Sequence, residues 1–206
     1  MDYITVESAT VTADIKRSEF ITEIRRVKSE EELFNELGKL KKQYSDATHI
    51  CYGAIFDKTG NSARFSDDGE PGGTAGAPIM DALKNSGLKE TLVAVVRYFG
   101  GIKLGAGGLV RAYSQSASEG IKAVSKISCS LCGIYSLDLD FSRAKKAPVF
   151  FEKNGIEVVG VEYGQSVKYD LAVSSGRSID ELISQFVSGK PSLTLIEKRY
   201  IEKKIN

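Results

Sequence analysis

Glycine is concentrated in one stretch of this chain, and that stretch constrains the fold more than any other feature of the sequence. More than half of the 20 glycines lie between Gly60 and Gly108. Glycine has no Cβ, so it permits positive φ angles and close backbone approaches that other residues avoid. We therefore expect unusual loops in this stretch and regular helices and strands on either side of it.

The first part of the chain predicts alternating strands and helices. Alternating apolar residues favour strands at 3–11 and 20–27, and Ser29 followed by Glu32 predicts the start of a helix that buries Leu33, Leu37 and Leu40. The same patterns predict strands at 48–56, 62–66 and 91–99 and helices at 75–83 and 109–124.

After Lys126 a second series of elements begins. We expect a strand at 134–141, a helix from Ser142 to 153, a hairpin of 156–163 with 167–173, a helix from Ser178 to 187 and a strand at 193–201. This β-α-β-β-α-β order is that of the ferredoxin-like split unit. The sequence therefore predicts an α/β chain of the α+β type with two domains, residues 1–128 and residues 134–206.

Charge and hydropathy exclude several classes of protein. The formal net charge is +1, so binding to a nucleic acid requires a local basic patch. The first twenty residues contain four acidic side chains and no long apolar run, which argues against a signal peptide and a membrane anchor. Three cysteines, an odd number, favour free thiols in a reducing compartment, and we expect a cytoplasmic protein.

Cysteine and histidine spacing suggests a zinc site only weakly. Cys129 and Cys132 form a C-x-x-C pair, and His49 and Cys51 lie two residues apart on a predicted apolar strand. Structural zinc usually has two close ligand pairs of knuckle type, whereas an H-x-C pair on such a strand is more often packing. We expect no metal and no cofactor, and we assign no role to the C-x-x-C pair.

The first candidate constellation is the acidic stretch from Ser66 to Thr74. Asp67, Asp68 and Glu70 could hold a hard cation or supply an acid and a base, but Asp, Gly and Pro also simply make consecutive turns before a helix. A third interpretation is ligand contact through Thr74 and the free N–H groups of Ala75, Gly76 and Ala77.

The second candidate constellation runs from Arg97 to Arg111. A buried strand, a glycine-rich loop and a helix start are what backbone recognition of a phosphate group requires, although neither common phosphate-loop signature matches. The alternative is close packing of the loop on the sheet. We predict an anion-binding surface, with His49, Asp67, Asp68 and Glu70 as neighbours and no catalytic residue. Its predicted members are Thr74, Gly76, Arg97, Gly100, Gly101, Lys103, Gly105, Gly107, Gly108 and Arg111.

Three ordered blocks, residues 47–52, 66–76 and 97–113, resemble the signature of the YigZ/IMPACT family. The resemblance implies the fold of ribosomal protein S5 domain 2 for the first two thirds of the chain. Residues ~134 to 200 are similar to the small carboxy-terminal domain of bacterial YigZ proteins. Ile50 departs from the expected pattern, because a polar residue is expected there, so this side chain is given no role in a site.

The resemblance implies a role in translation. Eukaryotic members regulate translation by binding proteins of the amino-acid starvation pathway, and the expected domain pair is similar to two successive domains of elongation factor G. These analogies favour a non-enzymatic protein that binds RNA, the ribosome or a protein of the translation apparatus, and they leave the oligomeric state open. Additional phosphate contacts could come from Lys16, Arg17, Arg25 and Arg26.

An enzyme is the alternative hypothesis. The S5-like superfamily also contains small-molecule kinases with a glycine-rich loop before a helix. In that case the glycine loop would bind a nucleotide, and Asp67, Asp68 or Glu70 would bind magnesium in a phosphotransferase or hydrolase. No base or phosphate-binding lysine stands at a recognised motif position, so the sequence favours the binding protein.

Overall fold

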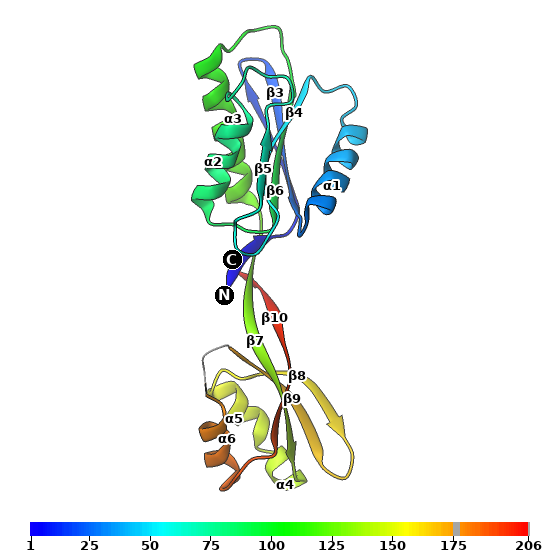
Figure 1. Ribbon diagram of the computed structural model, residues 1–206, viewed down its shortest axis with the longest axis vertical. Helices are drawn as coiled ribbons and strands as arrows, with labels where there is room; N and C mark the ends of the chain where they lie inside the picture. Colours follow the sequence, from blue (N-terminus) through cyan, green and yellow to red (C-terminus); the bar gives the residue numbers. More distant parts are fainter. Residues whose placement is uncertain (175–177, 206) are drawn as a thin grey trace. The chain divides into compact units, whose positions relative to one another are not determined.

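A five-stranded antiparallel sheet forms the centre of the first part of the chain in the computed structural model, which describes residues 1–174 and 178–205 (Figure 1). Its strand order is β2-β3-β6-β4-β5. The elements of this part are β1 (Tyr3–Val6), β2 (Ala9–Ile15), β3 (Ser18–Arg26), α1 (Glu30–Gln43), β4 (His49–Ile55), β5 (Ala63–Ser66), α2 (Gly76–Ser86), β6 (Thr91–Tyr98) and α3 (Ala106–Ala123).

Helices cover both faces of this sheet (Figure 1). The Ser29 hydroxyl caps α1 by accepting from the Glu32 N–H at 3.1 Å, and α1 buries Leu33, Leu37 and Leu40 on one face, as the sequence predicts. Helices α2 and α3 pack on the other face. Strand β6 is buried along almost its whole length because it lies at the centre of the sheet. The end of β6 and the start of α3 are therefore fixed by a rigid core.

The hairpin of β2 and β3 has an unusual turn. Its two central residues, Lys16 and Arg17, have φ angles of 48° and 67°. Two left-handed residues suit the tight turn that joins twisted antiparallel strands, but this turn usually contains Asn and Gly. The predicted strand at 3–11 is in fact two strands, because β1 pairs with β7 and β2 pairs with β3.

The second sheet contains the later strands of the chain. Strand β7 (Lys126–Leu139) lies between β9 (Val167–Ser174) and β10 (Leu193–Ile205), and β8 (Glu157–Tyr163) follows β9. With α4 (Phe141–Ala144), α5 (Ala147–Lys153) and α6 (Asp180–Val187), the elements follow the predicted β-α-β-β-α-β order. The predicted mixed α/β class is confirmed.

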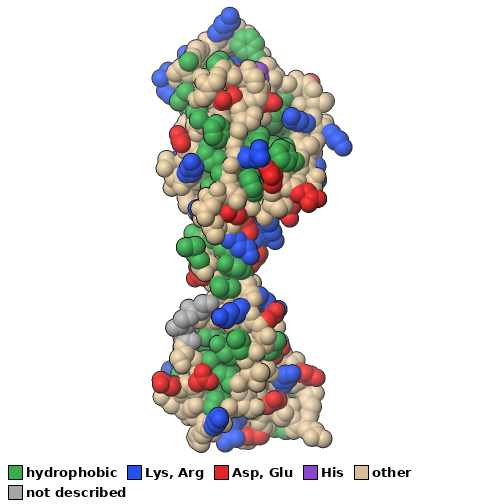
Figure 2. All heavy atoms as spheres, viewed as in Figure 1, with side chains coloured by type: hydrophobic (Ala, Val, Ile, Leu, Met, Phe, Trp, Pro, Cys, Tyr) green, Lys and Arg blue, Asp and Glu red, His purple; other side chains and the backbone are tan. Residues whose placement is uncertain are grey.

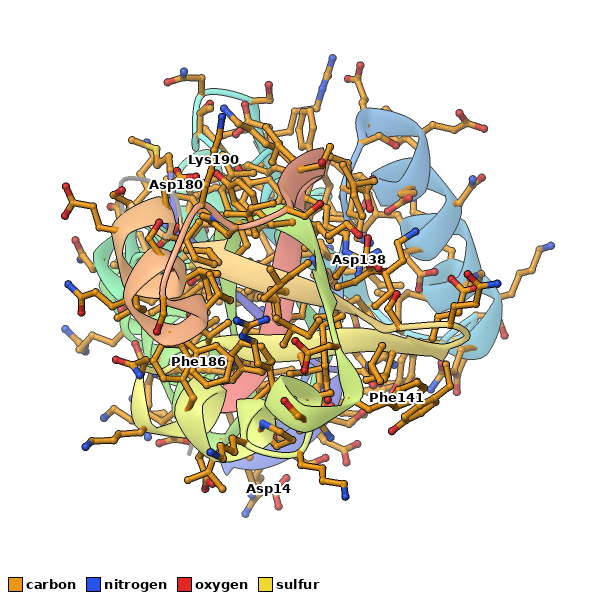
Figure 3. The ribbon with its side chains drawn as sticks, turned by 90° about the horizontal axis from the view of Figure 1, so that it is seen from below. Asp14, Asp138, Phe141, Asp180, Phe186 and Lys190 are labelled. Carbon is orange, nitrogen blue, oxygen red and sulfur yellow. The ribbon has the colours of Figure 1, made fainter. Side chains whose placement is uncertain are left out.

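Aromatic packing joins the helices of this second part. Phe186 of α6 stacks on Phe150 of α5 with ring centroids 4.4 Å apart, and Phe151 packs edge-on against Tyr169 of β9 (Figure 3, where Phe186 is labelled). These rings contribute to a second core that is separate from the cores of the first sheet.

Several predicted boundaries differ from the structure. Strand β7 begins at Lys126 rather than at 134, so the expected domain boundary lies within a strand. The helix expected from Ser142 is two short helices: α5 begins at Ala147 with Pro148 in its first turn, and Asp140 rather than Ser142 caps α4. Ile179, not Ser178, is the N-cap residue of α6.

Contacts divide the chain into two units. One unit is Tyr3–Ser128 together with the last residues from Lys203 onward, and the other is Met1–Asp2 with Cys129–Glu202. Strands β7 and β10 each contribute to both units. Within the described ranges, no helix is long and apolar enough to cross a membrane.

Candidate functional site

The acidic loop (residues 67–75) is held together by its own first carboxylate. Asp67 accepts hydrogen bonds from the backbone N–H groups of Gly73, Ala75 and Gly76 at 2.9, 3.0 and 2.8 Å. Partial burial raises the pKa of Asp67, but the three N–H donors outweigh it and lower the pKa below 3.8. The N–H groups of Ala75 and Gly76, predicted to be free for a ligand, are therefore occupied by Asp67.

Thr74 and Gly76 also differ from their predicted roles. The Thr74 hydroxyl donates to the Pro71 carbonyl at 2.7 Å, and the N-cap residue of α2 is Ala75, whose own side chain cannot cap the helix. A Cβ on Gly76 would lie 2.7 Å from the Ser66 backbone, so Gly76 serves close packing. The start of α2 is thus held by contacts within the protein.

Asp67→Ala is expected to lower the free energy of unfolding by ~1–2 kcal/mol at neutral pH, because three N–H groups lose their acceptor. The lowered pKa means that this stabilisation is complete above about pH 4 and is lost as the pH falls through the folded-state pKa. Urea unfolding at pH 7 and at pH 3 measures both effects. An equal difference between wild type and variant at the two pH values would contradict the capping role.

Asp68 and Cys51 attach the acidic loop to β4. The Asp68 carboxylate accepts from the Ile50 N–H at 2.7 Å, and the Cys51 thiol donates to the Asp67 carbonyl at 2.9 Å. Burial raises the pKa of Cys51 to about 12. Cys51 therefore acts as a buried hydrogen-bond donor and not as a nucleophile.

Glu70 lies at the centre of a buried polar cluster. Its Oε1 accepts from the Arg97 guanidinium at 2.6 Å and from the Tyr113 hydroxyl at 2.8 Å. Burial, the neighbouring Cys51 thiol and the Glu70 carboxylate raise the pKa of Tyr113. Tyr113 therefore remains a neutral donor to Glu70.

Arg97 does not act as the free cation that the sequence predicts. It is 5% exposed, paired with Glu70, and stacked between the rings of Phe20 and Phe99 at 5.6 and 5.5 Å. Its charge is balanced by Glu70 inside the protein.

The magnesium hypothesis does not fit these contacts, because Asp67, Asp68 and Glu70 each bind internal donors. Among the described residues, no group of three or more His, Cys, Asp or Glu side chains could hold a metal ion. Cys129 and Cys132 belong to a different unit from His49 and Cys51.

The glycine loop (residues 99–105) joins β6 to α3. A Cβ on Gly100 would lie 1.7 Å from the Arg17 carbonyl oxygen, so only glycine fits against the β2–β3 turn. Gly105 has φ 70° and precedes α3 without a side-chain cap. The N–H groups of Ala106, Gly107 and Gly108 have no acceptor in the described parts of the chain. Lys103 and Arg111 are exposed beside this helix start.

A cavity of about 360 Å³ lies beside the glycine loop. It brings together residues from both candidate constellations and from β4: Thr48, His49, Glu70, Pro71, Arg97, Phe99, Lys103, Leu104, Gly105, Ala106 and Leu109. Gly107, Gly108 and Arg111 belong to α3 and do not line the cavity. The residues Asp67, Asp68, Gly72, Gly73 and Gly76 do not line it either. Figure 2 shows His49, the single histidine of the chain, at the surface in purple.

Sequence reasoning missed Phe99 and Ser18. Phe99 is 46% exposed although it follows a buried strand, and its position before two glycines was the available signal. The Ser18 hydroxyl accepts from the Gly100 N–H at 3.3 Å and contacts Arg97, a pairing too distant in sequence to predict.

The additional basic residues separate into two pairs. Lys16 and Arg17 are exposed on the turn that contacts Gly100. Arg25 and Arg26 form ion pairs with Glu23 and Glu90 near the other end of β3. The predicted contribution of Arg25 and Arg26 to the same surface is therefore wrong. On the face in Figure 2, basic and acidic side chains are interspersed, so any anion contact is local.

Together these features define a class: α/β proteins whose glycine loop and helix start border a cavity on a helix-covered antiparallel sheet. The sequence model of the family "Impact N-terminal domain" matches residues 16–121 of this chain. "IMPACT family member YvyE" of Bacillus subtilis is 34% identical over 194 residues, which cover 93% of this chain and 89% of that protein. "IMPACT family member YigZ" of Escherichia coli is 28% identical over 193 residues, or 92% and 95% of the two chains.

A crystal structure described as that of "an hypothetical protein" is also similar. It shares 27% identity and a TM-score of 0.62 over 95% of this chain and 98% of its own. The chain belongs to the IMPACT family, as its sequence motifs predict.

Proposed function

We propose that this protein acts in translation by binding RNA of the translation apparatus through the start of α3. The observation that carries the proposal is that the N–H groups of Ala106, Gly107 and Gly108 have no acceptor within residues 1–174 and 178–205, and that they lie beside the exposed cations Lys103 and Arg111. N–H groups at a helix start and flanking cations are a favourable site for a phosphate group.

Charge supports a local contact rather than a general basic surface. The formal net charge of +1 gives no overall attraction to a polyanion. Arg97 and Glu70 neutralise each other inside the protein, so the charge available to RNA comes from Lys103 and Arg111, with Lys16 and Arg17 on the adjoining turn. Family membership supports the translational context, because the resemblance to the IMPACT family implies a role in translation.

The double variant Lys103→Gln/Arg111→Gln is expected to bind ribosomal subunits more weakly and with a flatter salt dependence. Losing two phosphate contacts, at ~0.7 per contact for single strands, should reduce the slope of log K against log salt by about one and a half. Sedimentation with ribosomal subunits and with RNA across a salt series measures this slope.

The matched control is Lys41→Gln/Lys42→Gln, which removes two exposed charges from the last turn of α1. Helix α1 lies on the opposite face of the sheet, so this control should leave the slope unchanged. An unchanged slope in the Lys103/Arg111 variant would show that the start of α3 does not bind RNA.

A further inference from the structure

The cavity beside the glycine loop places the His49 ring near the Glu70 carboxylate. His49 Nδ1 lies 2.8 Å from the Asp68 carbonyl oxygen, which only accepts, so Nδ1 carries a hydrogen. In the tautomer whose only ring hydrogen is on Nδ1, His49 Nε2 is an acceptor, and it lies 4.0 Å from Oε2 of Glu70, a second acceptor. Both residues line the cavity.

The charge of the cavity favours a neutral donor over a cation. The Glu70 carboxylate is already paired with the Arg97 guanidinium at 2.6 Å, and Lys103 lines the same cavity. An ammonium group would therefore meet two cations and one carboxylate. A hydroxyl group meets no such repulsion and still satisfies His49 or Glu70.

Other parts of the cavity match the remaining parts of a nucleotide. The Phe99 ring is 46% exposed, with Arg97 stacked on it, and it offers surface on which a base can stack. Gly105 and Ala106 line the cavity where α3 begins, beside the free N–H groups that suit a phosphate. The volume of about 360 Å³ is near the lower end for ligand sites and suits one nucleotide.

We propose that this cavity takes one unstacked nucleotide of single-stranded RNA and recognises its ribose 2′-hydroxyl through His49 and Glu70. The inference rests on the proposed function and adds to it the ability to distinguish RNA from DNA. Within a strand the 3′-oxygen is esterified, so the 2′-hydroxyl is the sugar donor that remains, and DNA lacks it.

The experiment compares three fluorescently labelled nonamers of one sequence: oligouridylate, its 2′-deoxy form and its 2′-O-methyl form. Fluorescence anisotropy at one salt concentration should show the wild-type protein binding the RNA about tenfold more tightly than either analogue, because both lack the donor. The three nonamers are compared on the same wild-type protein, so the result does not depend on whether a protein variant folds.

Protein variants then assign the effect to the cavity. His49→Ala should reduce RNA affinity towards that of DNA and leave DNA affinity unchanged, whereas Phe99→Ala should weaken both by about tenfold. Phe65→Ala, which removes another exposed ring from the same unit, is the control and should change neither.

The outcomes separate the two proposals. Equal binding of all three nonamers would overturn hydroxyl recognition, while the proposed RNA binding would stand. An RNA preference that persists unchanged in His49→Ala would also overturn it. Binding of none of the nonamers, together with no sedimentation with ribosomal subunits, would overturn the proposed function itself.

Discussion

Replacing Gly100 with alanine is expected to destabilise the N-terminal unit, the one that contains Tyr3–Ser128, by about 3 kcal/mol or more. The new Cβ would lie 1.7 Å from the carbonyl oxygen and 2.2 Å from the carbonyl carbon of Arg17. These are backbone atoms, so no side-chain rotation relieves the overlap. The turn they belong to already holds Lys16 and Arg17 at positive φ angles, which leaves it little freedom to move.

Gly72→Ala is the matched control for this prediction. Gly72 is an exposed loop glycine whose added Cβ would meet nothing within 4 Å, and it has no positive φ. Alanine there should be neutral or should stabilise by ~0.4–1 kcal/mol, because it reduces the freedom of the unfolded chain. Urea unfolding followed by circular dichroism compares the two variants. Similar stabilities for Gly100→Ala and Gly72→Ala would show that the loop and turn separate easily.

Local signals in the sequence were sufficient for α1, for β6 and for the hairpin of β8 and β9. Helix α1 has its predicted cap at Ser29 and its predicted buried face, because both depend on residues three or four positions apart. Strand β6 and the hairpin of β8 and β9 likewise follow from short apolar patterns. The predicted strand at 134–141 was too short, although Ile127, Cys129 and Leu131 alternate with Ser128 and Ser130, a period-two signal that marks the start of β7.

The interaction partners of the site residues could not be predicted from the sequence. The sequence identifies Asp67, Glu70 and Arg97 as residues of interest, but not their partners. Asp67 binds N–H groups six to nine residues away, and Glu70 pairs with Arg97 across 27 residues. The sequence alone predicts Arg97 to be a free cation. In the structure its charge is paired with Glu70, because the end of β6 and the acidic loop meet at one end of the sheet.

Glu70→Ala is expected to destabilise the N-terminal unit by about 3–5 kcal/mol. The substitution leaves the Arg97 guanidinium buried without its carboxylate and removes the acceptor of the Tyr113 hydroxyl. The Arg97 residue is only 5% exposed, so water can compensate little of the lost carboxylate, and only from the side that lines the cavity. Urea unfolding at pH 7 measures the loss, with Glu36→Ala as control, since the Glu36–Lys39 pair is a surface pair worth ~0.2–1 kcal/mol.

The double variant Glu70→Ala/Arg97→Met tests whether the unpaired charge is the cause. Met removes the charge and fills much of the arginine volume between the two rings, so the double variant should be more stable than Glu70→Ala alone. If both variants lose the same free energy of unfolding, the loss comes from the cavity and from Tyr113 rather than from the charge of Arg97. In either case Arg97→Gln should lower the free energy of unfolding more than it lowers RNA affinity. Loss of Lys103 and Arg111 should lower RNA affinity and leave the free energy of unfolding unchanged, because both side chains are exposed.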